Sequence, residues 1–555
     1  MIDRRHLLGA GALALLSTQA LTARAADTGL DLALVNGQVW TGRPSAPLAD
    51  AIGVAAGKIA AVGAGQVRAL TTSRTRVIDL AGAFAMPAFI DNHTHFRLAS
   101  TMLAQPDLLG AADRADFVNR VGQAASQLRP GRWLRGGSWD EQRLGGQLPD
   151  RHWIDAASPE TPFIAPRTDL HMYLVNSLAL RLAGITRETP DPAGGVIDRD
   201  ASGEPTGILR DNAKDLVDRV IPPTSEAETD EAMRAGIAHG LSRGVAQVHC
   251  PEIDWSVQDS LLRLRGRGET DMRFYSFVPL QDWERMAEFV AGHGRGDDWV
   301  RWGGVKGLAD GSLGSRTALF YDPYADAPDQ RGTRVMALDE LREAVIAADR
   351  HGLHVTVHAI GDRANDDVLD IFAEAERVNG ARDRRFRIEH AQHVRPQSIP
   401  RFARQNVIAS VQPFHAIDDG RWAVQRIGPA RLAGTYAFAS FLEAGARMTF
   451  GSDWPVGPID PITGVHAAVT RRTIDAANPD GWIPEEKITV EQALIAYTGQ
   501  NAYAGFQEDR LGELSIGRLA DIAVLDVNPL TAPIDGLAKI QVLQTIVDGQ
   551  PRYEA

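Results

Sequence analysis

Residues 353–390 read LHVTVHAIGDRANDDVLDIFAEAERVNGARDRRFRIEH and contain one complete strand, helix and strand. The run at 353–358 alternates polar and apolar residues as a β-strand does, and 386–390 is a second β-type run. Between them, 366–377 is rich in Ala, Glu, Arg and Leu and predicts a helix, as does 339–350 upstream. Strands that alternate with helices form parallel sheets, so this stretch predicts an α/β fold.

Both ends of the chain differ from this centre, because short β-type runs separated by glycine fill 27–86 and 505–555. We expect the two ends to meet as one small β-sandwich domain beside a TIM-like (β/α)8 barrel at 87–504. His95 and Lys306 stand 211 positions apart, where three β/α units need only about 90 residues. The surplus predicts insertions in this part of the barrel, and we expect substrate selectivity there.

The composition supports a folded protein and excludes several classes. Of 555 residues, 44% are hydrophobic and 23% are charged, which is not typical of a disordered or collagen-like chain. The formal net charge of -13 gives no reason to expect nucleic acid or an anionic membrane as a partner, and a small-molecule ligand is favoured. The single cysteine, Cys250, cannot form an intramolecular disulfide.

The first 25 residues resemble a twin-arginine-type signal peptide. Arg4 and Arg5 precede an apolar run at 7–16, and the small-x-small sequence at 23–25 suits cleavage. The apolar run is too short for a membrane span, which needs about 20 residues, and we expect no transmembrane helix. The interpretation predicts export to the periplasm, with the twin-arginine machinery as a partner. An ordinary secretory signal is the alternative.

Ligand-type side chains follow predicted strands at regular intervals. His93 and His95 stand two apart after an apolar run, so on an extended chain they point the same way. His358, His390 and Asp453 each end a β-type run, and their separations of 32 and 63 residues match one and two β/α units. Strand ends meet at one face of a barrel, so we expect these groups around one mouth, where they could bind metal.

Lys306 also follows a strand-like run, one unit before His358. Taken alone it would be a lysine paired with a carboxylate. Near metal ions and away from water, however, its pKa falls, and the neutral amine can take up carbon dioxide as a carbamate that bridges two metals.

In this order, His93-x-His95, Lys306, His358, His390 and Asp453 resemble the amidohydrolase superfamily, and the surrounding sequence resembles its YtcJ-like branch (amidohydrolase type 3, which includes N-substituted formamide deformylases). The resemblance covers nearly the whole chain after the signal peptide. The resembling phrases are MPAFIDNHTH at 86–95, DLHMYLVNSLAL at 169–180, KGLADGSLGSRTA at 306–318, HAIGDRA at 358–364, RIEHAQH at 387–393, GSDWPV at 451–456 and LGELSIGRLADIAVLD at 511–526. Ala88 departs from the glycine usual in the family after proline.

The resemblance implies a site with one or two divalent ions, zinc being the expected metal. It implies that His93, His95 and Asp453 bind the more buried ion, that His358 and His390 bind the second, and that carboxylated Lys306 bridges them. Asp453 would also move protons. The function implied is hydrolysis of a carbon-nitrogen bond in a small non-peptide amide, formamide or cyclic amide. An esterase or lactonase, or a non-catalytic metal- or solute-binding protein, remains an alternative, and a homo-oligomer stays open.

Other residues are weaker candidates for the substrate pocket. For each, a structural role such as bracing a loop, forming a salt bridge or packing in a wall is the alternative. They are Trp139, Asp169, His171, Asn176, Asp310, Arg316 and His415. His249 and His354 are expected to be hydrogen-bonded core histidines, and Cys250 a buried apolar residue rather than a nucleophile.

Overall fold

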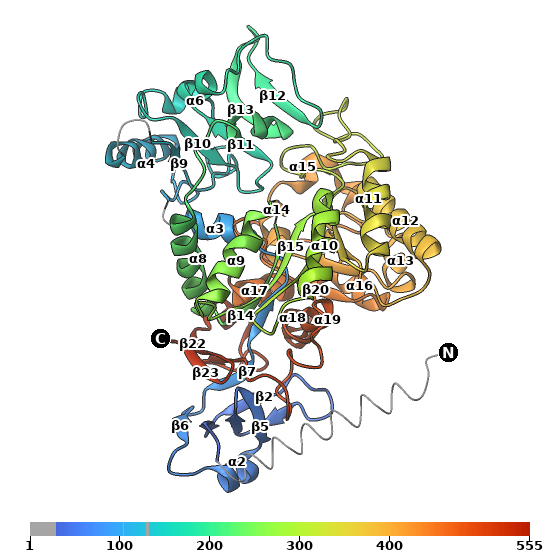
Figure 1. The fold of residues 1–555 in the computed structure, drawn as a ribbon. Coiled ribbons are helices and arrows are strands. Elements are labelled where there is room, and N and C mark those ends of the chain that lie inside the picture. Colours follow the sequence, from blue (N-terminus) through green and yellow to red (C-terminus); the bar gives the residue numbers. More distant parts are fainter. Residues whose placement is uncertain (1–28, 104, 129–131, 253) are drawn as a thin grey trace.

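The computed structural model describes residues 29–103, 105–128, 132–252 and 254–555 (Figure 1). The predicted signal peptide at 1–25 lies outside the described residues. Within the described part of the chain, no helix combines the length and apolar character needed to cross a membrane.

Eight parallel strands form the central sheet and follow one another in chain order. They are β8 (Phe89–Asp91), β14 (Val245–Pro251), β15 (Arg273–Pro279), β16 (Val300–Leu308), β17 (His354–Ala359), β18 (Arg387–His390), β19 (Ile408–Val411) and β20 (Met448–Phe450). The first and last strands also approach each other. Asn92 N donates to Phe450 O at 3.3 Å, and Thr94 and Trp454 form a parallel bridge. The sheet thus closes into the predicted (β/α)8 barrel.

Helices separate the strands and cover the barrel (Figure 1). They include α8 (Glu226–Leu241), α9 (Ser256–Gly266), α10 (Trp283–His293), α11 (Leu338–Arg350), α12 (Asp362–Asn379), α13 (Ile399–Arg404), α14 (Pro413–Asp419), α15 (Ala423–Ile427), α16 (Phe438–Glu443) and α17 (Pro461–Thr470). α12 buries Ala364, Val368 and Phe372 at helical spacing. It begins four residues before the predicted 366, because Asn365 Nδ2 donates to Gly361 O at 2.9 Å and stabilises the polar first turn.

Two sheets near the chain termini pack on a shared core at the foot of the molecule (Figure 1). In one, β7 (Phe84–Pro87) pairs antiparallel with β21 (Ile522–Leu525), so the two ends of the chain share a sheet. Its other strands are β2 (Gln38–Trp40), β3 (Leu48–Ala49), β22 (Val542–Val547) and β23 (Gln550–Glu554). The second sheet contains β1 (Leu32–Val35), β4 (Ile52–Ala55), β5 (Lys58–Val62) and β6 (Arg76–Asp79).

A separate five-stranded sheet lies between α3 (Phe96–Met102) and α8 in the chain and stands above the barrel (Figure 1). Its strands are β9 (Leu134–Arg135), β10 (Phe163–Pro166), β11 (Met172–Val175), β12 (Gly195–Arg199) and β13 (Pro205–Asp211). With α4 (Arg114–Gln127), α5 (Arg151–Ile154), α6 (Ser177–Leu182) and α7 (Asp215–Asp218) it forms what we call the inserted subdomain. It has apolar clusters of its own on both faces of the sheet.

Candidate active site

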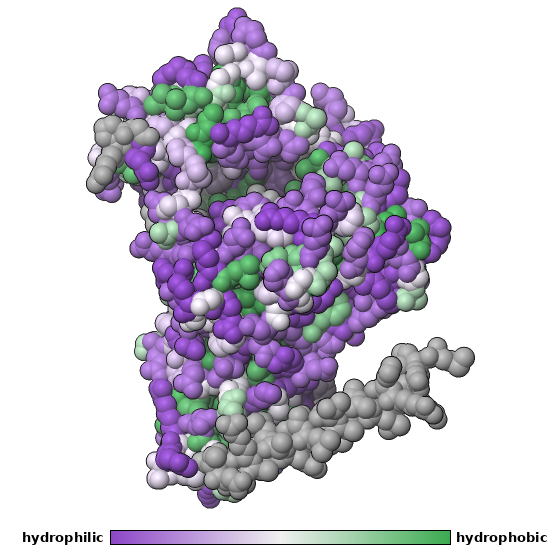
Figure 2. Space-filling model, in the orientation of Figure 1, coloured by the Kyte–Doolittle hydropathy of each residue, from purple (hydrophilic) through white to green (hydrophobic). Residues whose placement is uncertain are grey.

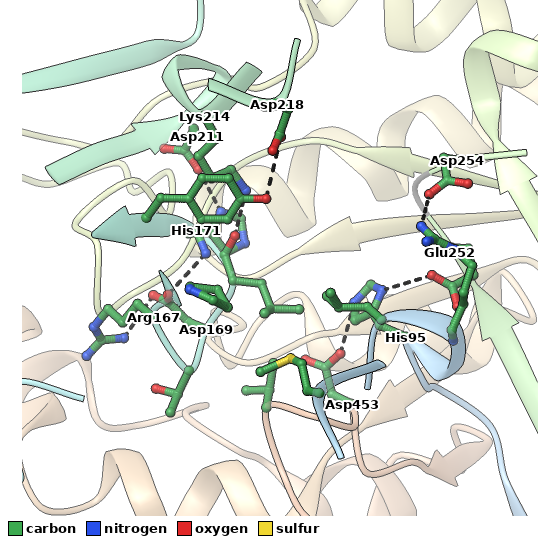
Figure 3. Close-up of a pocket in the computed structure, with 18 of the residues that line it drawn as sticks. His95, Arg167, Asp169, His171, Asp211, Lys214, Asp218, Glu252, Asp254 and Asp453 are labelled. Atoms are coloured by element: carbon green, nitrogen blue, oxygen red, sulfur yellow. Dashed lines mark hydrogen bonds and ion pairs between the residues drawn. The ribbon is translucent and has the colours of Figure 1, made fainter. Parts of the chain in front are cut away.

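A cavity of about 1030 Å³ lies between the barrel mouth and the inserted subdomain. Figure 2 shows the surface hollowed at this level. From the barrel, the cavity is lined by His95, Lys306, His358, His390 and Asp453. From the inserted subdomain, it is lined by Arg167, Asp169, His171, Asp211 and Lys214 (Figure 3). The strand-end residues expected around one mouth do gather there.

Three residues at the barrel mouth are close enough to share a metal ion. His93, His390 and Asp453 offer ligand atoms that all lie within 4.8 Å of one another, and all three residues are buried. His390 ends β18 and Asp453 follows β20, both in left-handed backbone conformations, with φ of 73° and 57°. Such conformations cost energy in residues other than glycine and are often found at functional sites.

Asp453 stands at the middle of the group. Its Oδ1 lies 3.3 Å from His93 Nε2 and 3.2 Å from His95 Nε2. Its Oδ2 faces the other side, 3.9 Å from His390 Nδ1 and 3.7 Å from His415 Nε2. One oxygen of this carboxylate therefore lies near His93 and His95, and the other lies near His390 and His415.

Buried hydrogen bonds set the orientation of the histidine rings. Glu389 Oε2 lies 2.6 Å from His93 Nδ1, which leaves Nε2 of that ring directed at Asp453. Glu389 is itself held by Arg387 at 2.6 Å and by the hydroxyls of Thr356 and Ser410. A ring nitrogen that donates a proton to such a partner leaves the other nitrogen with a free lone pair, as a metal ligand requires.

His358 and His390 also have one ring nitrogen bound to a neighbouring oxygen. His358 Nε2 lies 3.0 Å from the carbonyl of Gly311, and His390 Nδ1 lies 2.9 Å from Gln412 Oε1. Sequence reasoning did not identify Glu389 or Gln412. A charged residue inside the β-run at 386–390 was the available signal for Glu389, because both faces of a barrel strand are covered.

The protonation states suit a divalent cation. Burial, followed by the charge of Lys306, lowers the pKa of His93 to about 4, and burial lowers the pKa values of His358 and His390 well below the usual range. Burial would raise the pKa of Asp453, but His93 and the other histidines outweigh it and hold that pKa well below its usual range. His93, His358 and His390 are therefore neutral near neutral pH, which is the state in which an imidazole can bind a metal.

Two buried atoms of this group have no hydrogen-bond partner among the described residues, namely His93 Nε2 and Asp453 Oδ1. A buried polar atom without a partner is costly, so something else is expected to bind both atoms. Imidazole and carboxylate are ligands that zinc prefers, and the group therefore fits the implied metal. The three residues whose ligand atoms lie within 4.8 Å of one another are His93, His390 and Asp453. The resemblance groups His95 with His93 and Asp453 instead, and His95 Nε2 lies 3.2 Å from Asp453 Oδ1.

Lys306 lies in β16, is only 4% exposed and lines the cavity. Burial is the main reason that its pKa is lowered to about 8, and it outweighs the opposing charges of Glu389 and Asp453. Among the described residues, no carboxylate lies within ion-pair distance of the amine, so the alternative of a simple lysine-carboxylate pair does not hold.

The weaker candidates divide into two sets. Asp169, His171 and His415 line the cavity. Trp139 and Asn176 do not, and placing them in the pocket was wrong. Trp139 follows β9, forms an isolated bridge with Arg167 and belongs to an apolar cluster of the inserted subdomain, with Nε1 donating to Ala165 O at 3.0 Å. Asn176 caps α6, where its Oδ1 accepts from Ala179 N at 2.9 Å.

Asp310 and Arg316 also lie outside the cavity lining, although both follow Lys306 in the chain. Asp310 accepts hydrogen bonds from the backbone N–H groups of Leu319, Ile360 and Gly361 and holds the loop after β16. Arg316 forms an ion pair with Asp326 at 2.8 Å. Both residues therefore have a structural role, which the sequence analysis gave as the alternative to a place in the substrate pocket.

Two remaining histidines are core residues. His354 lies 3.0 Å from the hydroxyl of Tyr275 and 2.8 Å from the carbonyl of Arg385. His249 is buried beside Arg387 at 3.1 Å. The neighbouring Cys250 is buried too, and burial raises the pKa of its thiol well above the usual range, which does not suit a nucleophile.

Several known proteins are similar to this chain over most of its length. LONG AFTER FAR-RED 3 of Arabidopsis thaliana is 39% identical, covering 94% of this chain and 91% of that protein. YtcJ of Bacillus subtilis is 32% identical over 86% of this chain and 91% of its own length. The N-substituted formamide deformylase of Arthrobacter pascens is 28% identical over 94% and 98%.

Among solved structures, a metal-dependent hydrolase of Pyrococcus furiosus has a TM-score of 0.72 and 31% identity, covering 90% of this chain and all of that one. The sequence model of the amidohydrolase family matches residues 76–553. These matches confirm the resemblance to the YtcJ-like branch. The barrel and its buried group of histidines and aspartate agree with it. The chain belongs to the amidohydrolase family and is a metal-dependent hydrolase.

Proposed function

We propose that this enzyme hydrolyses a carbon-nitrogen bond in a small non-peptide amide, formamide or cyclic amide. The observation that carries the proposal is the placement of Asp453. One of its oxygens faces two histidine Nε2 atoms at 3.2 and 3.3 Å, and the other faces the cavity side beside His415. The same carboxylate can thus help hold a metal and reach a substrate bound in the cavity.

The residues that would hold the metal are those of the buried group and its neighbours on the barrel mouth. They are His93, His95, Lys306, His358, His390 and Asp453. We propose one or two divalent ions, with zinc expected, and a carbamate formed from Lys306 and carbon dioxide with loss of a proton. When bound, the metal supplies Lewis acidity and makes water more acidic.

The side chains would then direct the proton. The ionised Asp453 accepts a proton from the attacking water and delivers it to the nitrogen as the carbon-nitrogen bond breaks and a carbon-oxygen bond forms. The nitrogen leaves as an amine. The buried Glu389 keeps His93 in the tautomer whose Nε2 is free, and the inserted subdomain supplies one wall of the cavity.

Similarity to the N-substituted formamide deformylase of Arthrobacter pascens supports an amide or formamide as the substrate class. A matched pair of substrates tests this point, because N-benzylformamide and benzyl formate differ at the bond that breaks. A second pair, valerolactam and valerolactone, tests cyclic substrates. We expect a higher kcat/KM for the amide of at least one pair. Turnover of the esters alone would contradict the proposal.

Replacing Asp453 with Asn tests the proton transfer. We expect kcat to fall by about 10²- to 10⁴-fold, the range of general acid-base catalysis, while the metal stays largely bound. Steady-state kinetics and metal analysis of the same sample measure both effects. Asp509→Asn, at an exposed position, is the matched control and should behave as the wild type. Retained activity in Asp453→Asn would remove this residue as the base.

We also propose that residues 1–25 direct twin-arginine export and so place the enzyme in the periplasm. The support is the Arg4-Arg5 pair before an apolar run at 7–16. Replacing both arginines with lysine should leave the protein in the cytoplasmic fraction of a bacterial host, as detected by immunoblotting. Unchanged periplasmic recovery would contradict this route.

A further inference from the structure

The inserted subdomain brings a hydrogen-bonded pair of side chains to the metal-binding group. Asp211 Oδ1 lies 2.7 Å from His171 Nδ1, and the His171 ring is centred 5.4 Å from the ring of His358. Both residues of the pair line the cavity, and Figure 3 shows them across the cavity from His95. His171 precedes β11, and Asp211 ends β13.

Contacts with the loop after Lys306 fix this pair in place. His171 N donates to Asp169 Oδ1 at 3.1 Å, and Asp169 Oδ2 accepts from Ser312 Oγ at 2.5 Å. Asp211 N donates to His171 O at 2.9 Å, so the two residues are joined through their backbones as well. Asp211 also has a φ of 45°, a conformation that is unfavourable outside glycine and points to a functional constraint.

Gly311 links the pair to a candidate ligand. Its carbonyl accepts from His358 Nε2 at 3.0 Å. A Cβ at the same residue would lie 3.2 Å from Asp211 Oδ1 and 2.0 Å from Thr317 Oγ1. The contact with Thr317 leaves no room for a Cβ at Gly311, and the same backbone approaches Asp211 closely. The positions of the pair and of His358 therefore depend on the same backbone.

One atom of the pair is left for a ligand. Asp211 occupies Nδ1 of His171, whereas Nε2 has no hydrogen-bond partner in the described parts of the chain. We propose that His171 Nε2 forms a hydrogen bond with the substrate amide while it reacts, with Asp211 as the positioning residue. This inference rests on the proposed function and makes the inserted subdomain part of the catalytic apparatus rather than a cover alone.

The test compares His171→Ala and His171→Gln with the wild type, all loaded with zinc. Loss of a hydrogen bond to a reacting substrate costs about 10²- to 10³-fold, so we expect kcat/KM of His171→Ala to fall by that factor, mainly through kcat. Glutamine carries an amide at similar reach and should restore at least tenfold. Likewise, Asp211→Asn keeps an acceptor oxygen and should lose less activity than Asp211→Ala.

Asn176→Ala is the matched control, because it removes a buried polar side chain of the inserted subdomain that lies outside the cavity lining. It should lower thermal stability and leave kcat/KM unchanged. A folded, zinc-loaded His171→Ala enzyme within threefold of the wild type would overturn the inference. Loss of zinc in parallel with loss of activity would also overturn it, because His171 would then support the metal rather than the substrate.

Binding of acetohydroxamate, a small metal-binding amide analogue, provides a readout that needs no turnover. We expect its affinity for the zinc-loaded protein, measured by calorimetry, to fall at least tenfold in His171→Ala, and equal affinities would overturn the inference. If the wild type binds the hydroxamate but hydrolyses no amide, the proposed function fails, while this binding comparison still decides the role of His171.

Discussion

At the residue scale, the site combines ligands that the sequence reveals with supporting residues that it does not. His93, His95, His358, His390 and Asp453 could be selected because their spacing matches strand ends in a barrel. Glu389 and Gln412 were not selected, because their importance lies in contacts with rings from other strands, 2.6 Å from His93 and 2.9 Å from His390. Such contacts depend on register and side-chain direction, which spacing does not give.

Glu389→Gln tests whether this support matters. The change removes the negative charge that holds His93 Nδ1 and Arg387, all three side chains being fully buried. Loss of such an outer contact typically costs 10- to 100-fold in metal affinity, and we expect a loss in that range. Zinc titration against a competing chelator measures it. Glu508→Gln, which breaks the ion pair with Arg385 at 2.7 Å, is the control. Equal zinc affinities for Glu389→Gln and the wild type would refute the supporting role.

At the element scale, the loop after β16 connects the barrel to the inserted subdomain. Asp310 accepts from the backbone N–H of Leu319 within this loop and from the N–H groups of Ile360 and Gly361 after β17. Ser312 and Ser315 both donate to Asp169, at 2.5 and 3.1 Å. The loop thus sets how the inserted subdomain stands over the cavity. Its role is structural along most of its length and becomes chemical only where it meets His358 and Asp211.

Gly311→Ala should disturb this loop. The added methyl would come within 2.0 Å of Thr317 Oγ1 and 3.2 Å of Asp211 Oδ1, so the loop must shift. We expect a loss of stability of about 1 to 3 kcal/mol, as for other overpacked sites, and a fall in kcat/KM of at least tenfold. Thermal denaturation and kinetics measure the two effects.

Gly292→Ala is the control for the same chemical change. Gly292 lies in α10 with open space around its added Cβ, so alanine should be neutral or stabilise by up to about 1 kcal/mol. If Gly311→Ala matched this control in both stability and kinetics, the loop after β16 would not couple the barrel to the inserted subdomain.

The inserted sheet shows where prediction from the sequence ends. The barrel strands could be expected because strand and helix patterns are local and their repeat length is regular. The gap between His95 and Lys306 showed that extra chain was present, but not what it folds into. Trp139 was misplaced for this reason: it does follow a strand, but that strand belongs to the inserted sheet, and Trp139 is part of the same apolar cluster as Phe163 and Leu174.

At the scale of the whole molecule, buried histidines make stability depend on pH. Burial lowers the pKa of both His354 and His393 to about 3, from 6.5 for a free histidine. The unfolded chain therefore binds protons that the folded protein excludes. Their contribution is complete above pH 6.5 and is lost as the pH falls toward 3. At pH 5 each such histidine reduces stability by about 2 kcal/mol relative to pH 8.

His354→Gln isolates one of these groups. Denaturant unfolding at pH 8 and pH 5 should show a smaller loss of stability in this variant than in the wild type, by about 2 kcal/mol. His152→Gln, at an exposed position, is the control and should leave the pH dependence unchanged. An identical pH dependence in His354→Gln and the wild type would show that His354 is not the source.

The central claim is that a buried centre at the barrel mouth binds a catalytic metal. Its most direct test is an anomalous difference map from crystals of zinc-loaded protein, measured at the zinc absorption edge. We predict a peak within coordination distance of His93 Nε2 and Asp453 Oδ1, which belong to the buried group and have no hydrogen-bond partner among the described residues. A map from fully loaded, active protein with no peak at this position, or with zinc bound only elsewhere, would contradict the account.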